Sequence, residues 1–237
     1  RRDGVGRKTV AIGDCTPDVG AILDALLCAS RYVVIKLSPM LDISAAFVVL
    51  KCVREIHVVS VKGECKELLF VIDSLYEGKP VYYAVNLGLS DQVFTCTHEE
   101  KNSALLRVAS EHVASASATC IYEPHASILK AGLQDVLCER YAVEKLHPMS
   151  NLFVSSSPVQ DFPGRGFEIV ASCGFGKKEL RAMLAGVTKA NITARNFPTS
   201  VAELRKKLRL AEGGDVYLFA TTVADGSHCL IRCIKHG

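Results

Sequence analysis

Long apolar stretches separated by short polar breaks dominate the first ninety residues. Thr16-Pro17 pairs a hydroxyl with a proline, as helix starts often do, and the apolar residues after it recur at helical spacing. Residues 32–37 (YVVIKL) are almost continuously apolar, which is typical of a parallel strand buried on both faces. We therefore expect a helix that starts at Thr16-Pro17 and includes Leu27, a second helix over 43–53, and strands over 32–37, 56–61 and 81–87. Residues 65–72 could form a strand or a helix, and we favour a strand.

This order of elements predicts an α/β fold with a parallel sheet, but only about half of a doubly wound one. In such sheets the ligand lies at the carboxyl ends of the strands. The opening RRDGVGRK is thus expected to be a loop that leaves a strand preceding Arg1. A half-sheet would also leave an apolar edge and face uncovered, which offers a surface for self-association.

The middle of the chain has a weaker pattern. Residues 94–97 suggest a short strand, and 99–113 and 133–141 suggest helices. Pro124 is expected at the first position of a further helix that Gly132 closes. The run Ser155-Ser156-Ser157-Pro158 marks a boundary or an exposed loop.

The last third predicts a small α+β unit of order β-α-β-α-β-β. Ser200 and Glu203 have the spacing of a capping box, and Asp225-Gly226 lies at a hairpin turn. The expected strands are 167–171, 190–195, 216–222 and 229–234, and the expected helices are 177–184 and one that follows Ser200.

Charge is unevenly distributed along the chain. The net charge is +3, yet residues 161–237 hold 12 Lys and Arg against 7 Asp and Glu. Such an excess favours an anionic partner, most often nucleic acid, although a solvated face has the same composition. Gly174 to Lys178 puts glycines and two cations at a predicted helix start, where backbone N–H groups can hold a phosphate. The candidate phosphate-binding residues are Lys177, Lys178, Arg195, Arg205, Lys206, Lys207 and Arg209. A Phe or Arg in the turns at 162–165 and 196–198 could contact a base.

Several common classes of site have little support. The ten cysteines form no C-x-x-C pair, and the seven histidines form no H-x-x-x-H, so we expect no metal site. Buried thiols are typical of a reducing cytoplasm, and no apolar run is long enough to span a bilayer. We therefore expect a cytoplasmic protein with no membrane segment.

Several motifs together resemble a bacterial, Bacteroidetes-type family. They are Arg1-Arg2-Asp3, Asp14-Cys15-Thr16-Pro17-Asp18, Lys36-Leu37-Ser38-Pro39-Met40-Leu41-Asp42, Val61-Lys62-Gly63-Glu64-Cys65-Lys66-Glu67, Tyr122-Glu123-Pro124, Lys130-Ala131-Gly132, Asp161-Phe162-Pro163-Gly164-Arg165 and Ala194-Arg195-Asn196-Phe197-Pro198. The family is the class I S-adenosylmethionine-dependent methyltransferases that carry a THUMP-like domain.

The resemblance implies three domains. These are the C-terminal half of a Rossmann-like methyltransferase sheet over 1–89, a small ferredoxin-like insert over 90–158, and a THUMP-like RNA-binding domain over 159–237. It also implies an RNA substrate, tRNA or rRNA. Arg1, Arg2 and Asp3 resemble the tail of the active-site motif, and the loop Lys36 to Pro39 would border that site.

In this family the residues that hold the methyl donor lie mostly upstream of Arg1. The resemblance therefore implies a C-terminal fragment that is inactive alone, with S-adenosylmethionine bound by the intact enzyme. Two alternatives stay open at this point. One is a non-catalytic RNA-binding adaptor that keeps the methyltransferase scaffold. The other is a methyltransferase acting on a small molecule or a protein, with the basic domain binding another anion.

Overall fold

The computed structural model describes residues 12–88, 91–109 and 118–235, and the chain divides into two compact units. Unit 1 comprises Arg1–Ser103 and His125–Leu133, and unit 2 comprises Ala104–Pro124 and Gln134–Gly237. The segment His125–Leu133 thus belongs to unit 1, although the residues on both sides of it belong to unit 2. The expected division into 1–89, 90–158 and 159–237 stays a prediction.

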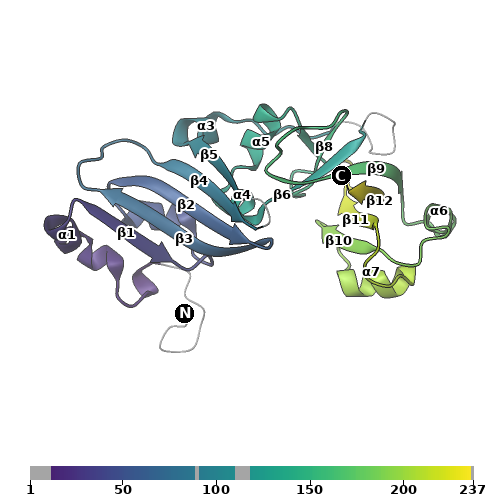
Figure 1. Ribbon diagram of the computed structural model, residues 1–237, viewed down its shortest axis with the longest axis horizontal. Helices are drawn as coiled ribbons and strands as arrows, with labels where there is room; N and C mark the ends of the chain where they lie inside the picture. Colours follow the sequence, from purple (N-terminus) through teal and green to yellow (C-terminus); the bar gives the residue numbers. More distant parts are fainter. Residues whose placement is uncertain (1–11, 89–90, 110–117, 236–237) are drawn as a thin grey trace. The chain divides into compact units, whose positions relative to one another are not determined.

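Unit 1 is built on a five-stranded sheet of order β1-β3-β2-β4-β5 (Figure 1). Its strands are β1 Tyr32–Leu37, β2 Val53–Val61, β3 Glu64–Asp73, β4 Val81–Leu87 and β5 Gln92–Thr97. β2 and β4 pair in parallel, and the other three pairings are antiparallel. The sheet is therefore mixed, which corrects the expectation of a parallel one. Since β1 and β2 are both antiparallel to β3, they run in the same direction and α2 connects them as a crossover helix.

One face of this sheet is covered. The helices of unit 1 are α1 Val19–Ala29, α2 Ile43–Val49, α3 His98–Ser103 and α4 Ala126–Ala131, and a short 3₁₀ turn spans Ile12–Asp14. On β1, Ile35 and Leu37 are buried whereas Val34 is 63% exposed. β1 is thus an edge strand with one buried face, not the doubly buried strand that its composition suggested. Self-association through the open face stays a prediction.

Three local expectations in unit 1 and its neighbouring segments were wrong. α1 begins at Val19, because the Asp18 carboxylate accepts hydrogen bonds from the first turn and Thr16 does not cap it. Pro124 ends a strand and His125 precedes α4, although Gly132 closes that helix in the left-handed conformation as expected. The helix expected over 99–113 ends at Ser103.

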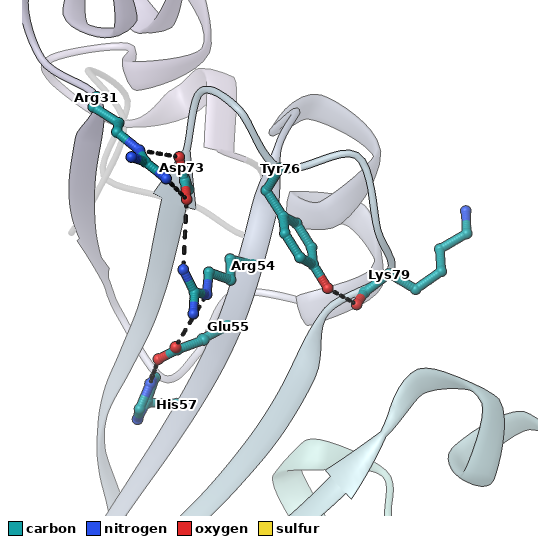
Figure 2. A network of polar contacts seen from close by, with 7 residues as sticks. All are labelled: Arg31, Arg54, Glu55, His57, Asp73, Tyr76 and Lys79. Carbon is teal, nitrogen blue, oxygen red and sulfur yellow. Dashed lines mark hydrogen bonds and ion pairs between the residues drawn. The ribbon is translucent and has the colours of Figure 1, made fainter.

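A buried carboxylate ties three strands of unit 1 together (Figure 2). Asp73 accepts hydrogen bonds from Arg31 Nε and Nη2 at 3.0 and 3.3 Å and from Arg54 Nη1 at 3.5 Å. These interactions, the bond from Arg31 above all, lower the pKa of Asp73 below its ordinary value. The carboxylate side chain is only 4% exposed, so its neutralisation by arginine is needed for burial.

Unit 2 is built on a seven-stranded sheet of order β10-β11-β12-β9-β6-β8-β7 (Figure 1). Its strands are β6 Cys120–Pro124, β7 Glu144–Lys145, β8 Phe153–Ser155, β9 Gly164–Cys173, β10 Asn191–Arg195, β11 Val216–Thr222 and β12 His228–Lys235. Its helices are α5 Gln134–Arg140, α6 Lys177–Met183 and α7 Val201–Leu208. The predicted β-α-β-α-β-β order from β9 onward is confirmed, as is the capping box of α7 at Ser200 and Glu203.

The sheet of unit 2 has a core on each face. Phe167, Phe219 and Ile231 belong to the core on one face. Leu204 of α7 packs with Leu218 on the other face. α7 is therefore held by its apolar side, and its basic residues lie on the rest of its surface.

Candidate nucleic-acid interface

A groove with a volume of about 670 Å³ lies along β10 and α7 in unit 2. It is lined by Arg165, Asn191, Ile192, Thr193, Val201, Ala202, Arg205, Lys206 and Glu212. Three of these side chains are cations and one is an acid. This β10–α7 groove therefore combines positive charge with the hydrogen-bonding groups of an asparagine and a threonine, which suits a phosphate-rich ligand.

Arg205 is held in place at the groove. Its Nη1 donates to the carbonyl oxygen of Ala190 at 3.1 Å, just before β10. α7 presents Arg205 and Lys206 here because its capping box sets its start and Leu204 faces the core. A guanidinium has five N–H donors, so this single bond leaves donors that a phosphate could use.

A buried carboxylate organises two further arginines. Glu123, on β6, is paired in register with Arg165 on β9 and accepts a hydrogen bond from Arg165 Nη2. Its other oxygen accepts bonds from Arg195 Nε and Nη2 at 3.0 and 2.6 Å. The Glu123 side chain is 6% exposed, against 51% for Arg165 and 44% for Arg195. The buried carboxylate thus orients two half-exposed guanidiniums. Glu123 was not among the site residues predicted from the sequence.

The same ion cluster shows that the sheet curls. β10 and β6 are separated by three strands in the sheet order, yet Arg195 of β10 reaches Glu123 of β6. Asn196 Nδ2 likewise lies 3.0 Å from His147 Nδ1, which follows β7. The curl brings Arg165 beside Asn191 and Thr193 in one groove. The acidic residue in the apolar run CIYEP was the signal in the sequence that could have pointed to Glu123.

The remaining predicted cations lie elsewhere in unit 2. Lys207 Nζ is 5.5 Å from the centroid of the Phe175 ring, and Arg209 caps the end of α7 in the left-handed conformation. Lys177 and Lys178 are the exposed first residues of α6. The roles of these four residues in RNA binding stay predictions.

The turn before α6 already holds a carboxylate. A Cβ added at Gly174 would lie 2.9 Å from Glu179 Oε2, and one added at Gly176 would lie 3.1 Å from the same atom. Glu179 therefore folds back over the helix start, where its charge interacts favourably with the backbone N–H groups. A phosphate bound by these backbone N–H groups would have to displace the Glu179 carboxylate. The side chains of Lys177 and Lys178 are therefore better candidates for phosphate contact than the backbone of this turn.

The expected catalytic residues Arg1, Arg2 and Asp3 lie outside the described residues. The loop after β1, which was expected to border the same site, is held in place. Lys130 Nζ donates to the carbonyl oxygen of Leu41 at 2.7 Å, and the Asp42 carboxylate caps α2 through Ala45 N at 2.8 Å. α4 thus fixes the conformation of the segment that follows the carboxyl end of β1.

We tested whether the residues at this sheet end fit a nucleoside methyl donor. Such sites pair a glycine-rich turn for close backbone approach with an acidic residue for the ribose hydroxyls. After β1 the chain reads Ser38-Pro39-Met40-Leu41-Asp42, with no glycine, and Asp42 is engaged as a helix cap. The described residues here therefore do not fit a donor site by themselves.

Two other kinds of feature are absent from the part of the chain that the structure describes. No group of three or more His, Cys, Asp or Glu side chains in 12–88, 91–109 and 118–235 could hold a metal ion. Within the same ranges, no helix is both long and apolar enough to cross a bilayer.

Comparison with known proteins gives two domain matches and one structural match. Residues 164–235 match the model of the THUMP domain-like family, and residues 121–163 match a ferredoxin-like domain model. A search of curated proteins gives no match. The crystal structure of a protein described as a "putative methyltransferase from Porphyromonas gingivalis W83" superposes with a TM-score of 0.86 and 36% sequence identity.

That superposition covers 96% of this chain but 57% of the other. The chain thus spans little more than half the length of the protein that it matches. The expected ferredoxin-like and THUMP-like domains are confirmed by the domain matches. The chain is similar over nearly its whole length to part of a protein described as a methyltransferase, and it ends in a THUMP-like domain.

Proposed function

We propose that this chain is the C-terminal part of a cytoplasmic S-adenosylmethionine-dependent RNA methyltransferase, in which the THUMP-like domain binds tRNA or rRNA. The observation that carries the proposal is the β10–α7 groove, where Arg165, Arg205 and Lys206 meet within the residues that match the THUMP-like model. RNA binding is dominated by phosphate contacts, and arginine is suited to them by its planar fork of donors.

The role proposed for unit 2 is to hold the RNA while methyl transfer takes place at a site outside unit 2. In the whole protein, S-adenosylmethionine would supply an electrophilic methyl group. Arg1, Arg2 and Asp3 are proposed to belong to that active site. Lys130 orders the loop after β1, which is expected to border the same site, through its bond to Leu41. Because the described residues do not fit a donor site, we expect this chain alone to be inactive.

A non-catalytic RNA-binding adaptor that keeps the methyltransferase scaffold is the second candidate. An assay of the whole protein separates the two functions. Radiolabelled methyl transfer from S-adenosylmethionine to bulk tRNA or rRNA is expected for the enzyme. An adaptor would bind the same RNA and transfer no label.

RNA binding is tested by filter binding of a structured tRNA-like RNA at several salt concentrations. The parent chain should bind at low salt, and log affinity should fall linearly with log salt. Lys206→Glu should weaken binding and flatten the slope by about 0.7 to 0.9 for the lost phosphate contact. The double variant Lys177→Glu, Lys178→Glu should also weaken binding without unfolding the chain, because exposed charges contribute little to stability.

The matched control is Lys79→Glu, which makes the same charge change at an exposed lysine of unit 1. It should leave the affinity within a factor of about two, because Lys79 is not part of the β10–α7 groove and an exposed charge that makes no contact with the ligand is largely screened. Absence of parent binding at low salt would refute the RNA function. If Lys206→Glu binds like Lys79→Glu, the groove is not the interface.

A further inference from the structure

Three rings form a row at one end of the unit 2 sheet. The centroids of Phe175 and Phe197 lie 4.9 Å apart, and those of Phe197 and His228 lie 5.0 Å apart. Phe175 follows β9, Phe197 follows β10, and His228 begins β12. The three rings thus come from segments far apart in the sequence and meet where these strands begin or end. We call them the Phe175–Phe197–His228 platform.

Hydrogen bonds of the scaffold hold the platform in place. The Asn196 carbonyl oxygen accepts bonds from Thr222 Oγ1 at 2.6 Å and from Thr222 N at 3.2 Å. Thr222 is in turn the register partner of His228 across the hairpin. Phe197 is therefore fixed beside His228 by two elements of the ladder, and its position does not depend on a flexible loop.

The chemistry of the platform differs from that of a sealed core. His228 is exposed, and Phe175 and Phe197 are half-buried with their inner parts against the core of α6 and α7. Lys207 Nζ lies over the Phe175 ring, and Lys177 and Lys178 follow it closely in the chain. Two acids, Glu179 and Asp225, are close in sequence to the residues of the platform. The three lysines outnumber them, so this end has a small excess of positive charge.

We propose that the Phe175–Phe197–His228 platform stacks unpaired bases of the bound RNA. The inference rests on the proposed RNA function and adds the ligand that this end of the sheet would take. Every base has a π-face, so a row of aromatic rings beside lysines binds single-stranded nucleic acid with little sequence preference. The β10–α7 groove binds phosphates, whereas the platform distinguishes an RNA strand from a bare polyanion.

The test compares two probes of equal charge. One is a 12-nucleotide oligoadenylate, and the other is an abasic ribose-phosphate 12-mer with the same phosphates. The parent chain should bind the oligoadenylate more tightly, since stacking contributes to that complex alone. His228→Ala and Phe197→Leu should each weaken oligoadenylate binding by roughly fivefold or more, in line with the contribution of a stacked base. Neither change should alter abasic binding or the salt slope.

Two controls keep the test specific. Tyr32→Leu removes an exposed aromatic ring of unit 1. Like Phe175, Tyr32 has a cation over its ring, since Arg31 Cζ lies 4.9 Å from the ring centroid. The Tyr32→Leu variant should bind both probes like the parent. His228 is exposed, so His228→Ala should keep the parent's thermal unfolding midpoint even if Phe197→Leu loosens the core.

The outcomes separate the two proposals. If the parent binds the tRNA-like RNA at low salt but neither 12-mer, the platform alone is wrong, and if it binds none of the three, the RNA function and the platform are both wrong. If the parent binds the abasic strand as tightly as oligoadenylate, the platform alone is wrong. It is also wrong if His228→Ala matches Tyr32→Leu on both probes, or if it weakens both probes equally.

Discussion

Arg195 on β10 donates two hydrogen bonds to Glu123 on β6, at 3.0 and 2.6 Å, although three strands separate β10 from β6 in the sheet order. This ion pair closes the curl of the unit 2 sheet and orients Arg195 and Arg165 together. One buried acid therefore supports both the shape of the THUMP-like region and the position of two cations beside its groove.

Glu123→Ala should destabilise unit 2 by about 1 to 3 kcal/mol, the usual effect of removing one partner from hydrogen bonds with a charged group. The loss should stay below that of a fully buried pair, because both guanidiniums are half-exposed and water can solvate them. Glu123→Gln keeps an acceptor and should lose less. Urea denaturation followed by circular dichroism measures the change.

The exposed Glu168 on β9 gives the matched control, since Glu168→Ala removes an acid from the same sheet without this burial. Its free energy of unfolding should stay within about 0.5 kcal/mol of the parent. Equal effects of Glu123→Ala and Glu168→Ala would show that the ion cluster does not stabilise the curled sheet.

Asp73 should make unit 1 sensitive to acid. Its pKa is lower in the folded chain than in the unfolded one, chiefly through the bond from Arg31. Its stabilisation is thus fully present above the unfolded pKa, about 3.9, and is lost as the pH falls through the lower folded pKa. The difference in unfolding midpoint between the parent and Asp73→Asn should be clear at pH 7 and should narrow below about pH 4.

Thermal unfolding followed by calorimetry from pH 7 to pH 2 provides the measurement. Arg31→Gln removes the main cause of the shift and should flatten the acid dependence in the same way as Asp73→Asn. A parallel pH dependence in the parent and both variants would contradict a role for this carboxylate.

Gly164 should tolerate no side chain. A Cβ there would lie 2.3 Å from the Glu123 carbonyl oxygen and 2.7 Å from Pro124 Cα, so β9 and β6 could not keep their spacing. Gly164→Ala should therefore cost about 1 to 3 kcal/mol of stability, as overpacking generally does. The control is Gly88→Ala, where an added Cβ meets no atom within 4 Å. Chemical denaturation should separate the two variants, and equal stability would show that the strands can move apart freely.

Much of the local structure could be predicted because its causes lie within a few residues. The capping box of α7 needs only Ser200 and Glu203, and the closure of α4 needs only Gly132, whose left-handed conformation suits glycine. The β11–β12 hairpin follows from its turn and its flanking apolar runs. The basic residues of α7 could likewise be identified, since helical spacing alone puts Arg205 and Lys206 away from Leu204.

Only the tertiary structure decided what depends on distant partners. The apolar composition of 32–37 does not specify how many strands flank it or what covers it. The segment was expected to be a parallel strand buried on both faces, but among the described strands β1 lies at an edge and pairs only with β3, antiparallel. Neither can spacing pair Glu123 with Arg195, which is 72 residues away, or bring Phe175, Phe197 and His228 into one row. These arrangements follow from sheet register and curl, which are set by packing over the whole unit.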